Sequence, residues 1–265
     1  MPRKPMPAEW KKLAHLFDEI NESFIDYQEQ ASFLLTCRDR LCPDAALALD
    51  LGCATGQHAW RLAEAGLQVV GLDLSPALLL RGKKLRRKAA PPHFVCGDMT
   101  ALPLGARFDL IYALNFVVSF LHTNVALRSA LAEIRRVLAP HGLFVMDYHF
   151  FFPQTAADPL ASTWRERCRV RGQTLTVTHR PLVDWRTQLS TDRMTYRFRE
   201  GRRLVRELES TEVRRISLPQ DLRLILELAG FEVLHHCARF DLDKQPGGGL
   251  GVIVGKRRQD RKLRP

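Results

Sequence analysis

The stretch Leu49-Asp50-Leu51-Gly52-Cys53-Ala54-Thr55-Gly56 decides how this 265-residue chain folds. It ends an apolar run, residues 45–51, which is typical of a buried parallel strand. A turn of small residues follows, and the pattern of residues 57–64, closed by Gly66, predicts a helix. A strand, a glycine-bearing turn and a helix start together bring backbone amides close to a ligand. The stretch therefore predicts a site for a nucleotide-like ligand after the first strand.

The spacing of the small residues in this turn differs from the dinucleotide fingerprint. That pattern requires G-x-G-x-x-G, whereas Gly52, Ala54 and Gly56 form a G-x-A-x-G. The string L-D-L-G-C-A-T-G, with the acidic residue Asp50, resembles the first motif of class I S-adenosylmethionine-dependent methyltransferases. Within that family it is similar to the small-molecule type with methyltransferase domain 11 or 25. Ala54 stands where the family commonly has a middle glycine, and its small side chain leaves room for the ligand.

The next two predicted strands each carry an acidic residue at or next to their carboxyl end. Residues 68–74 predict the second strand, and a carboxylate at the position of Asp73 can accept from both ribose hydroxyls. Nicotinamide folds share this feature, so Asp73 indicates a ribose without naming the cofactor. Residues 93–98 predict the third strand. The resemblance implies that Asp98 accepts from the adenine amine and that Met99 offers its backbone amide; an Asp that only caps a turn is the alternative.

The fourth predicted strand, residues 108–114, leads to the region where the family places its acceptor. The resemblance implies that the Leu114 carbonyl accepts from the methionine ammonium. Asn115 follows without the prolines of the N-P-P-Y motif, which disfavours the enzymes that methylate amines of bases or glutamine. The resemblance implies S-adenosyl-L-methionine as the cofactor. The implied cofactor-binding residues are Asp50, Gly52, Cys53, Ala54, Gly56, Asp73, Leu74, Asp98, Met99, Leu114 and Asn115.

Four side chains are candidates for a catalytic base. Transfer from a sulfonium needs mainly alignment, and a base is required only if the acceptor arrives protonated. Tyr148 ends the fifth predicted strand, residues 142–148, and His149 follows it, at the edge where open α/β sheets bind ligands. His122 lies near a helix start. Tyr27 belongs to the N-terminal helices, which cover the ligand in similar methyltransferases. No metal ligand is expected.

Residues 151–215 alternate with period two, which predicts an inserted antiparallel sheet with turns at Arg171-Gly172 and Glu200-Gly201. Arginines occupy alternate positions on two of its strands. They form either an anion-binding surface or a solvated face paired with glutamates of a neighbouring strand. Those glutamates are Glu207, Glu209 and Glu212. In the small-molecule enzymes that this arrangement resembles, such an insert is a lid over the acceptor pocket.

The core resumes after the insert. Ser217-x-x-Gln220 is a capping-box signature, and residues 231–237 and 250–255 predict a terminal hairpin that NAD-binding domains lack. We therefore predict four parts. They are an N-terminal helical cap (1–44), a methyltransferase core (45–150 and 216–258), an antiparallel β insertion that forms the lid and acceptor site (151–215), and a flexible tail (259–265).

Composition limits the function classes. No apolar run approaches the roughly 20 residues that span a bilayer. We therefore expect no membrane partner and a cytoplasmic location. The six cysteines form no C-x-x-C pair, which indicates reduced thiols. The net charge is +11, and residues 151–265 contribute most of it, with 23 Lys and Arg against 14 Asp and Glu. An anionic partner, RNA included, or a solvated basic face explains this excess.

These observations predict an α/β fold. We expect a Rossmann-like, seven-stranded mixed sheet with helices on both faces, plus a small antiparallel lid. The predicted function is methyl transfer from S-adenosylmethionine to a nitrogen or oxygen atom of a small molecule by in-line displacement. The first alternative is an RNA methyltransferase that uses the arginine-rich insert. The second is an accessory protein that binds the cofactor and transfers nothing.

Overall fold

The structure, a computed structural model, describes residues 16–85, 90–150, 163–245 and 249–258. The chain divides into two compact units. The larger unit comprises Gln28–Phe150 and Ser217–Pro265, and the smaller comprises Met1–Tyr27 and Phe151–Ile216. The N-terminal segment that we predicted as one cap is therefore shared, since residues up to Tyr27 group with the insert and the rest with the core.

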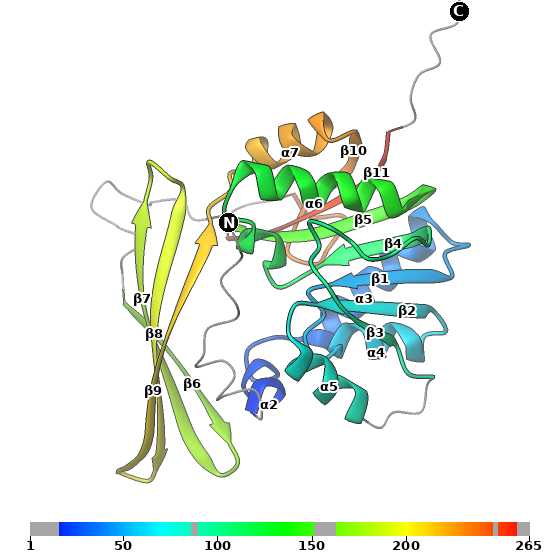
Figure 1. Cartoon of the computed structure of the whole chain (residues 1–265). Coiled ribbons are helices and arrows are strands. Elements are labelled where there is room, and N and C mark those ends of the chain that lie inside the picture. Colours follow the sequence, from blue (N-terminus) through cyan, green and yellow to red (C-terminus); the bar gives the residue numbers. More distant parts are fainter. Residues whose placement is uncertain (1–15, 86–89, 151–162, 246–248, 259–265) are drawn as a thin grey trace, which may run out of the picture. The chain divides into compact units, whose positions relative to one another are not determined.

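The larger unit is built on a seven-stranded sheet with the order β10-β11-β5-β4-β1-β2-β3 (Figure 1). Strands β1 to β5 pair in parallel, and β11 runs antiparallel to β5 and β10. The sheet is therefore mixed, as predicted. Its strands are β1 (Leu47–Leu51), β2 (Gln68–Asp73), β3 (His93–Cys96), β4 (Phe108–Ala113), β5 (Leu138–Phe150), β10 (Phe231–Ala238) and β11 (Gly249–Arg257).

Helices cover both faces of this sheet. One apolar cluster joins the strands to α6 and α7, through side chains such as Leu131 and Leu222. A second cluster on the other face joins them to α3 and α4, through Leu34 and Leu62. Because both faces are buried, the strands carry near-continuous apolar runs. The helices are α3 (Tyr27–Leu41), α4 (Gln57–Glu64), α5 (Pro76–Lys84), α6 (Asn124–Val137), α7 (Pro219–Leu228) and the short 3-10 helix η2 (Val117–Phe120).

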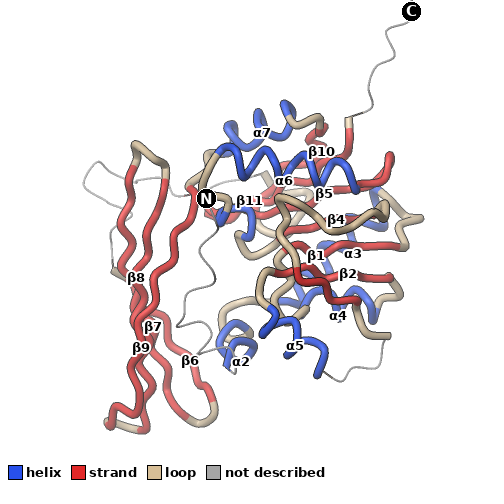
Figure 2. Tube along the Cα trace, in the orientation of Figure 1, coloured by secondary structure: helices blue, strands red, loops and turns tan. Residues whose placement is uncertain are grey.

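The smaller unit is a four-stranded antiparallel sheet in the order β6-β7-β8-β9 (Figure 2). Its strands are β6 (Trp164–Val170), β7 (Gln173–Asp184), β8 (Leu189–Glu200) and β9 (Arg203–Arg215). The short helix α2 (Phe17–Asn21) places Ile20 in the apolar cluster of this sheet, beside Leu175 and Phe198. The predicted turns at Arg171-Gly172 and Gly201 adopt positive φ values, which favour tight hairpins.

Two local predictions differ from the structure. The first helix after the insert begins at Pro219 with Leu218 at its N-cap, and no side chain caps it, so the capping box at Ser217 is wrong. Strand β5 begins at Leu138, because β4 pairs with it from there, whereas we predicted that the fifth strand begins at residue 142. No helix in the described ranges is long and apolar enough to cross a bilayer.

Candidate functional site

The turn after β1 has the backbone that a close ligand requires. Gly52, Ala54 and Gly56 all adopt left-handed φ values, of 71°, 50° and 80°. A Cβ atom on Gly52 would lie 2.6 Å from Val117, so no larger residue fits there. Gly56 is also the N-cap of α4 and offers no side chain to the first-turn amides. This turn therefore brings backbone, rather than side chains, to the carboxyl edge of the sheet.

Asp50 is a buried carboxylate directly beneath this turn. It is 2% exposed, and its Oδ2 atom makes no hydrogen bond with the residues that the structure describes. Burial raises the pKa of Asp50 to about 8; the Tyr112 hydroxyl opposes this rise, and the nearby Asp73 carboxylate contributes to it. A cationic ligand that binds beside a buried carboxyl oxygen without a hydrogen-bond partner offsets the free-energy cost of burying that oxygen. The residues therefore fit a positively charged cofactor such as S-adenosylmethionine.

Asp73 ends β2 and holds the turn. Its Oδ2 atom accepts from the Ala54 amide at 2.9 Å, and its Oδ1 atom accepts from the Ser75 amide at 2.7 Å. Each oxygen keeps a second lone pair, so the carboxylate can still accept from a ribose. Burial raises the pKa of Asp73, and these backbone hydrogen bonds oppose the rise. The next residue, Leu74, is 56% exposed.

Asp98 and Met99 follow β3. The Asp98 Oδ1 atom accepts from both the amide and the hydroxyl of Thr100, each at 2.7 Å, so this carboxylate does cap a turn. Met99 is buried in the same apolar cluster as Leu51 and Leu72. The backbone of this turn therefore has a fixed course next to the end of β2.

The loop after β4 is clamped by Asp147, a carboxylate of β5 that is not among the predicted cofactor-binding or catalytic residues. Leu114 is buried, and Asn115 and Phe116 are consecutive non-glycine residues with φ near 60°. Their amides donate to the two oxygens of Asp147, at 2.7 Å each. Asp147 is 1% exposed in β5, next to β4. Two left-handed residues in sequence are costly, and these two bonds offset that cost.

A chain of neutral side chains reaches Asn115 from the helices. The Gln30 Nε2 atom of α3 donates to the Asn115 Oδ1 atom at 3.0 Å, and the Gln30 Oε1 atom lies 2.6 Å from the His58 Nε2 atom of α4. Burial, with a smaller effect of Arg61, lowers the pKa of His58 to about 3. Sequence reasoning missed Gln30 and His58, because their positions belong to no motif.

The predicted catalytic side chains come from separate parts of the chain. Tyr148 is 4% exposed, and its hydroxyl bonds to His236 of β10. His122 is exposed just before α6, and Tyr27 is buried at the first position of α3. The backbone of His149 lies in β5, while its side chain falls outside the described residues.

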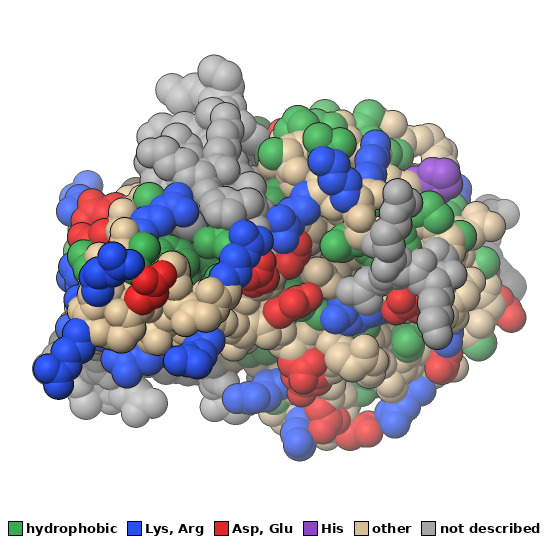
Figure 3. Space-filling view, turned by 90° about the horizontal axis from the view of Figure 1, so that it is seen from below, with side chains coloured by type: hydrophobic (Ala, Val, Ile, Leu, Met, Phe, Trp, Pro, Cys, Tyr) green, Lys and Arg blue, Asp and Glu red, His purple; other side chains and the backbone are tan. Residues whose placement is uncertain are grey.

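The arginines of the four-stranded sheet are only partly paired. Arg197 donates to Glu207 at 2.5 Å, as expected for a solvated face. Glu212, which we also placed among the partners, bonds instead to Arg214 on its own strand. Basic side chains, with acidic ones among them, stand along the left margin of Figure 3, where this unit lies. Anion binding by this face stays a prediction.

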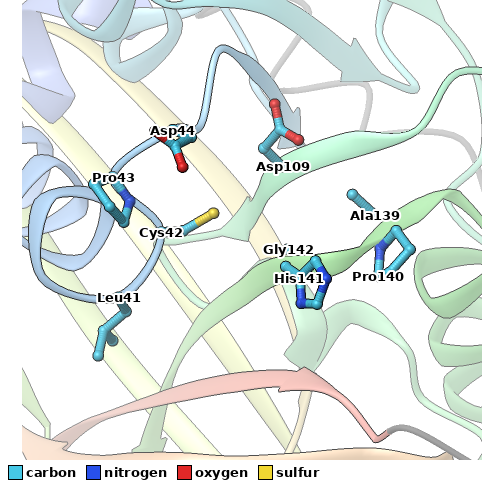
Figure 4. Close-up of a pocket in the computed structure, with 9 residues that line it drawn as sticks. All are labelled: Leu41, Cys42, Pro43, Asp44, Asp109, Ala139, Pro140, His141 and Gly142. Atoms are coloured by element: carbon cyan, nitrogen blue, oxygen red, sulfur yellow. The ribbon is translucent and has the colours of Figure 1, made fainter.

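A pocket lies at the opposite, amino-terminal edge of the larger sheet. Figure 4 shows Asp109, Asp44, Cys42 and His141 around it, near the starts of β1, β4 and β5. The Asp109 Oδ2 atom is occupied, since it accepts from the amides of Ala46 and Leu47 at 3.0 Å each. Parallel sheets bind ligands at their carboxyl edge, so we do not assign the site to this pocket.

Sequence comparisons agree with this geometry. Residues 48–142 match a family model described as a methyltransferase domain. A dTDP-3-amino-3,6-dideoxy-alpha-D-glucopyranose N,N-dimethyltransferase of Streptomyces fradiae is 30% identical over 54% of this chain and 55% of its own length. A dTDP-4-amino-2,3,4,6-tetradeoxy-D-glucose N,N-dimethyltransferase of Saccharopolyspora spinosa is 36% identical over 55% and 57%. The chain thus matches just over half the length of these curated relatives.

The fold is shared over almost the whole chain. The sugar N-methyltransferase KedS8 from Streptoalloteichus superposes with a TM-score of 0.74 and 23% identity, over 98% of this chain and 96% of that one. A S-adenosylmethionine-dependent methyltransferase from Clostridium acetobutylicum has a TM-score of 0.75 at 16% identity, over 94% and 99%. At these identities the likeness shows the fold alone.

Proposed function

We propose that this protein is a class I S-adenosylmethionine-dependent methyltransferase that methylates an amino nitrogen of a small molecule. The match of residues 48–142 to a methyltransferase domain supports this proposal. S-adenosylmethionine is the cofactor of this family. The two curated relatives described above are named for N,N-dimethylation of dTDP-linked amino sugars. An amino sugar is therefore the first acceptor class to test, and a hydroxyl acceptor is the alternative.

The cofactor would lie along the carboxyl edge of β1 to β4. We assign the ribose to Asp73, the adenine to Asp98 and Met99, and the methionine part to the Leu114 carbonyl and Asn115. Gly52, Cys53, Ala54 and Gly56 would surround it with backbone, with Leu74 beside the adenosine. The buried carboxylate of Asp50, whose Oδ2 atom has no hydrogen-bond partner among the described residues, supports a positively charged group at this edge.

The choice of nitrogen over oxygen as the acceptor atom is supported by the protonation states of the buried His58 and Tyr148. When bound, S-adenosylmethionine supplies a methyl group on a positively charged sulfur, so the protein needs mainly to align the acceptor. His58, with a pKa lowered to about 3 by burial, is a poor base. Burial also raises the pKa of Tyr148, whose hydroxyl is bonded to His236. A neutral amine has its own lone pair, whereas a hydroxyl needs a base.

An acceptor that arrives as an ammonium would still have to lose a proton. We propose His122, which follows β4 and η2, and His149, near the carboxyl end of β5, for this step. Tyr27, at the start of α3, is the remaining candidate. Single substitutions of His122, His149 and Tyr27, compared with Tyr148→Phe, would identify the base. The variant that lacks the base should lose turnover at low pH.

The experiment is a label-transfer assay. The protein is incubated with methyl-tritiated S-adenosylmethionine and with paired acceptors, amino sugar nucleotides and their hydroxyl analogues, then with a cell extract. Label in the amines supports the proposal, and label in the hydroxyl analogues would move it to oxygen. Label lost on ribonuclease treatment would instead favour RNA as the acceptor. Cofactor binding without transfer to any pool would favour the accessory protein.

A further inference from the structure

Three polar side chains from three distant parts of the chain form a line at the carboxyl edge of the sheet. His58 of α4 contacts Gln30 of α3, and Gln30 contacts Asn115 after β4, at 2.6 Å and 3.0 Å. His58 and Gln30 are 6% and 7% exposed. A buried polar line of this kind is costly unless each member is satisfied, so its geometry is strongly determined.

The tautomer of His58 and the orientation of the two amide side chains determine each other. The Gln30 amide nitrogen donates to Asn115, so its carbonyl oxygen must accept from His58. With the Gln30 amide in this orientation, His58 carries its proton on Nε2. At the other end, the Asn115 oxygen is occupied by Gln30, and the Asn115 Nδ2 group is the part left to meet a ligand. Reversing the tautomer of His58 would reverse both amides and present the Asn115 oxygen instead.

The backbone of Asn115 is held independently. Its amide donates to the Asp147 Oδ2 atom, and the amide of Phe116 donates to Oδ1. The neighbouring Val117 packs against Gly52 of the first turn. Main chain and side chain of Asn115 are thus fixed from two different elements, beside the turn that we assign to the cofactor.

We propose that Gln30 and His58 are positioning residues that aim the Asn115 amide nitrogen at the carboxylate of the cofactor's methionine part. This inference rests on the proposed function. It follows from adjacency: Leu114, whose carbonyl we assign to the ammonium, precedes Asn115, and ammonium and carboxylate share one carbon atom. A neutral N–H donor can bind a carboxylate. The line of His58, Gln30 and Asn115, which we call the relay, is neutral and therefore adds no charge beside Asp50.

The variant Gln30→Glu tests the direction of the relay. A carboxylate only accepts, so Asn115 would have to turn its nitrogen toward residue 30 and its oxygen toward the ligand. His58 would gain a proton beside the new carboxylate, against the opposing charge of Arg61 and next to the Tyr112 ring. Gln28→Glu is the matched control, because it adds the same charge to the same helix at an exposed position.

The test measures the affinities of each variant for two ligands by calorimetry. S-adenosylhomocysteine carries the amino-acid part, and 5′-methylthioadenosine lacks it. We expect Gln30→Glu to weaken S-adenosylhomocysteine about tenfold and 5′-methylthioadenosine less than about twofold. Gln30→Met, which deletes the relay without adding charge, should weaken the same ligand selectively. Equal losses for both ligands, unchanged affinities, or an equal effect of Gln28→Glu would overturn the inference.

Nitrogen NMR of the His58 ring gives a second readout that a merely structural role would not move. We expect Nε2 to carry the proton in the wild-type protein near neutral pH, and the ring to titrate at higher pH in Gln30→Glu. A proton on Nδ1 would overturn the relay. If the ligand selectivity holds but no acceptor is methylated, the relay stands and the proposed transfer fails. If the wild-type protein does not bind S-adenosylhomocysteine, both fail.

Discussion

Asp50 couples cofactor binding to stability at a single residue. Its pKa is raised to about 8 by burial, so from about pH 4 to 8 the folded state binds more protons than the unfolded state. The stability of the cofactor-free protein should therefore fall as pH rises through this range. We expect Asp50→Asn to raise the melting temperature, by more at pH 8 than at pH 5, and to weaken cofactor binding. A variant that binds the cofactor normally would contradict this role.

Asp73 provides a sharper test of the cofactor site. We expect Asp73→Ala to weaken S-adenosylmethionine binding by about 1–3 kcal/mol, because a charged acceptor for the ribose is lost. Asp73 also holds the amides of Ala54 and Ser75, so a ligand control is needed. A 2′,3′-dideoxy analogue should bind the wild-type and variant proteins about equally by calorimetry. A variant with unchanged affinity for S-adenosylmethionine would exclude the assignment.

At the scale of elements, the conformation of the loop after β4 depends on Asp147 of β5. The two oxygens of Asp147 each accept one backbone amide, and an Asn side chain can replace only one of these acceptors. We expect Asp147→Asn to lower the free energy of unfolding by about 1–3 kcal/mol in urea melts. The exposed Asp243→Asn is the control and should change it by less than about 0.5 kcal/mol. Equal effects would mean that the clamp contributes nothing.

The four-stranded sheet contains its own titrating element. His179 of β7 stacks on Trp164 at 4.4 Å and lies 2.7 Å from Asp192 and 3.4 Å from Glu166. Burial disfavours its charge, but the bonds to the two carboxylates outweigh burial and raise the pKa of His179 to about 9.

A raised pKa for a histidine adds stability that is complete below about pH 6.5 and is lost as pH rises through about 9. We therefore expect His179→Gln to lower the melting temperature at pH 6 and to matter much less at pH 10. Differential scanning calorimetry of both proteins at the two pH values is the measurement. A loss that is the same at both pH values would indicate packing against Trp164 rather than charge.

The whole molecule consists of units with separate cores. In the part of the chain that the structure describes, each apolar cluster lies within one unit: two belong to the larger unit, and the third joins α2 to the inserted sheet. We expect a protein with residues 153–213 replaced by a short linker to retain S-adenosylmethionine binding and to lose methyl transfer. Calorimetry and the label-transfer assay measure the two properties. Full turnover by the shortened protein would refute the lid that the family resemblance implies.

Much of the fold was predictable because its signals are local. The left-handed φ of Gly66, the Ser75 cap on the Leu78 amide, and the turn at Arg171-Gly172 all depend on a few neighbouring residues. Local rules fail where tertiary contacts compete. Ser217 has the sequence of a cap, yet the helix begins after Leu218. The start of β5 is likewise set by pairing with β4, so the strand begins at Leu138 and not at the predicted residue 142.

The sequence by itself determined the strand-turn-helix at Asp50 to Glu64, because periodicity and small residues act over a few positions. It also placed Asp73, Asp98 and Asn115 at strand ends. Only the tertiary structure decided what these groups contact. Gln30 is 28 residues from His58 and 85 from Asn115 in the chain, and Asp147 is 32 from Asn115. No local pattern records such distances, since hydrogen bonds between helices and strands form only once the sheet brings them together.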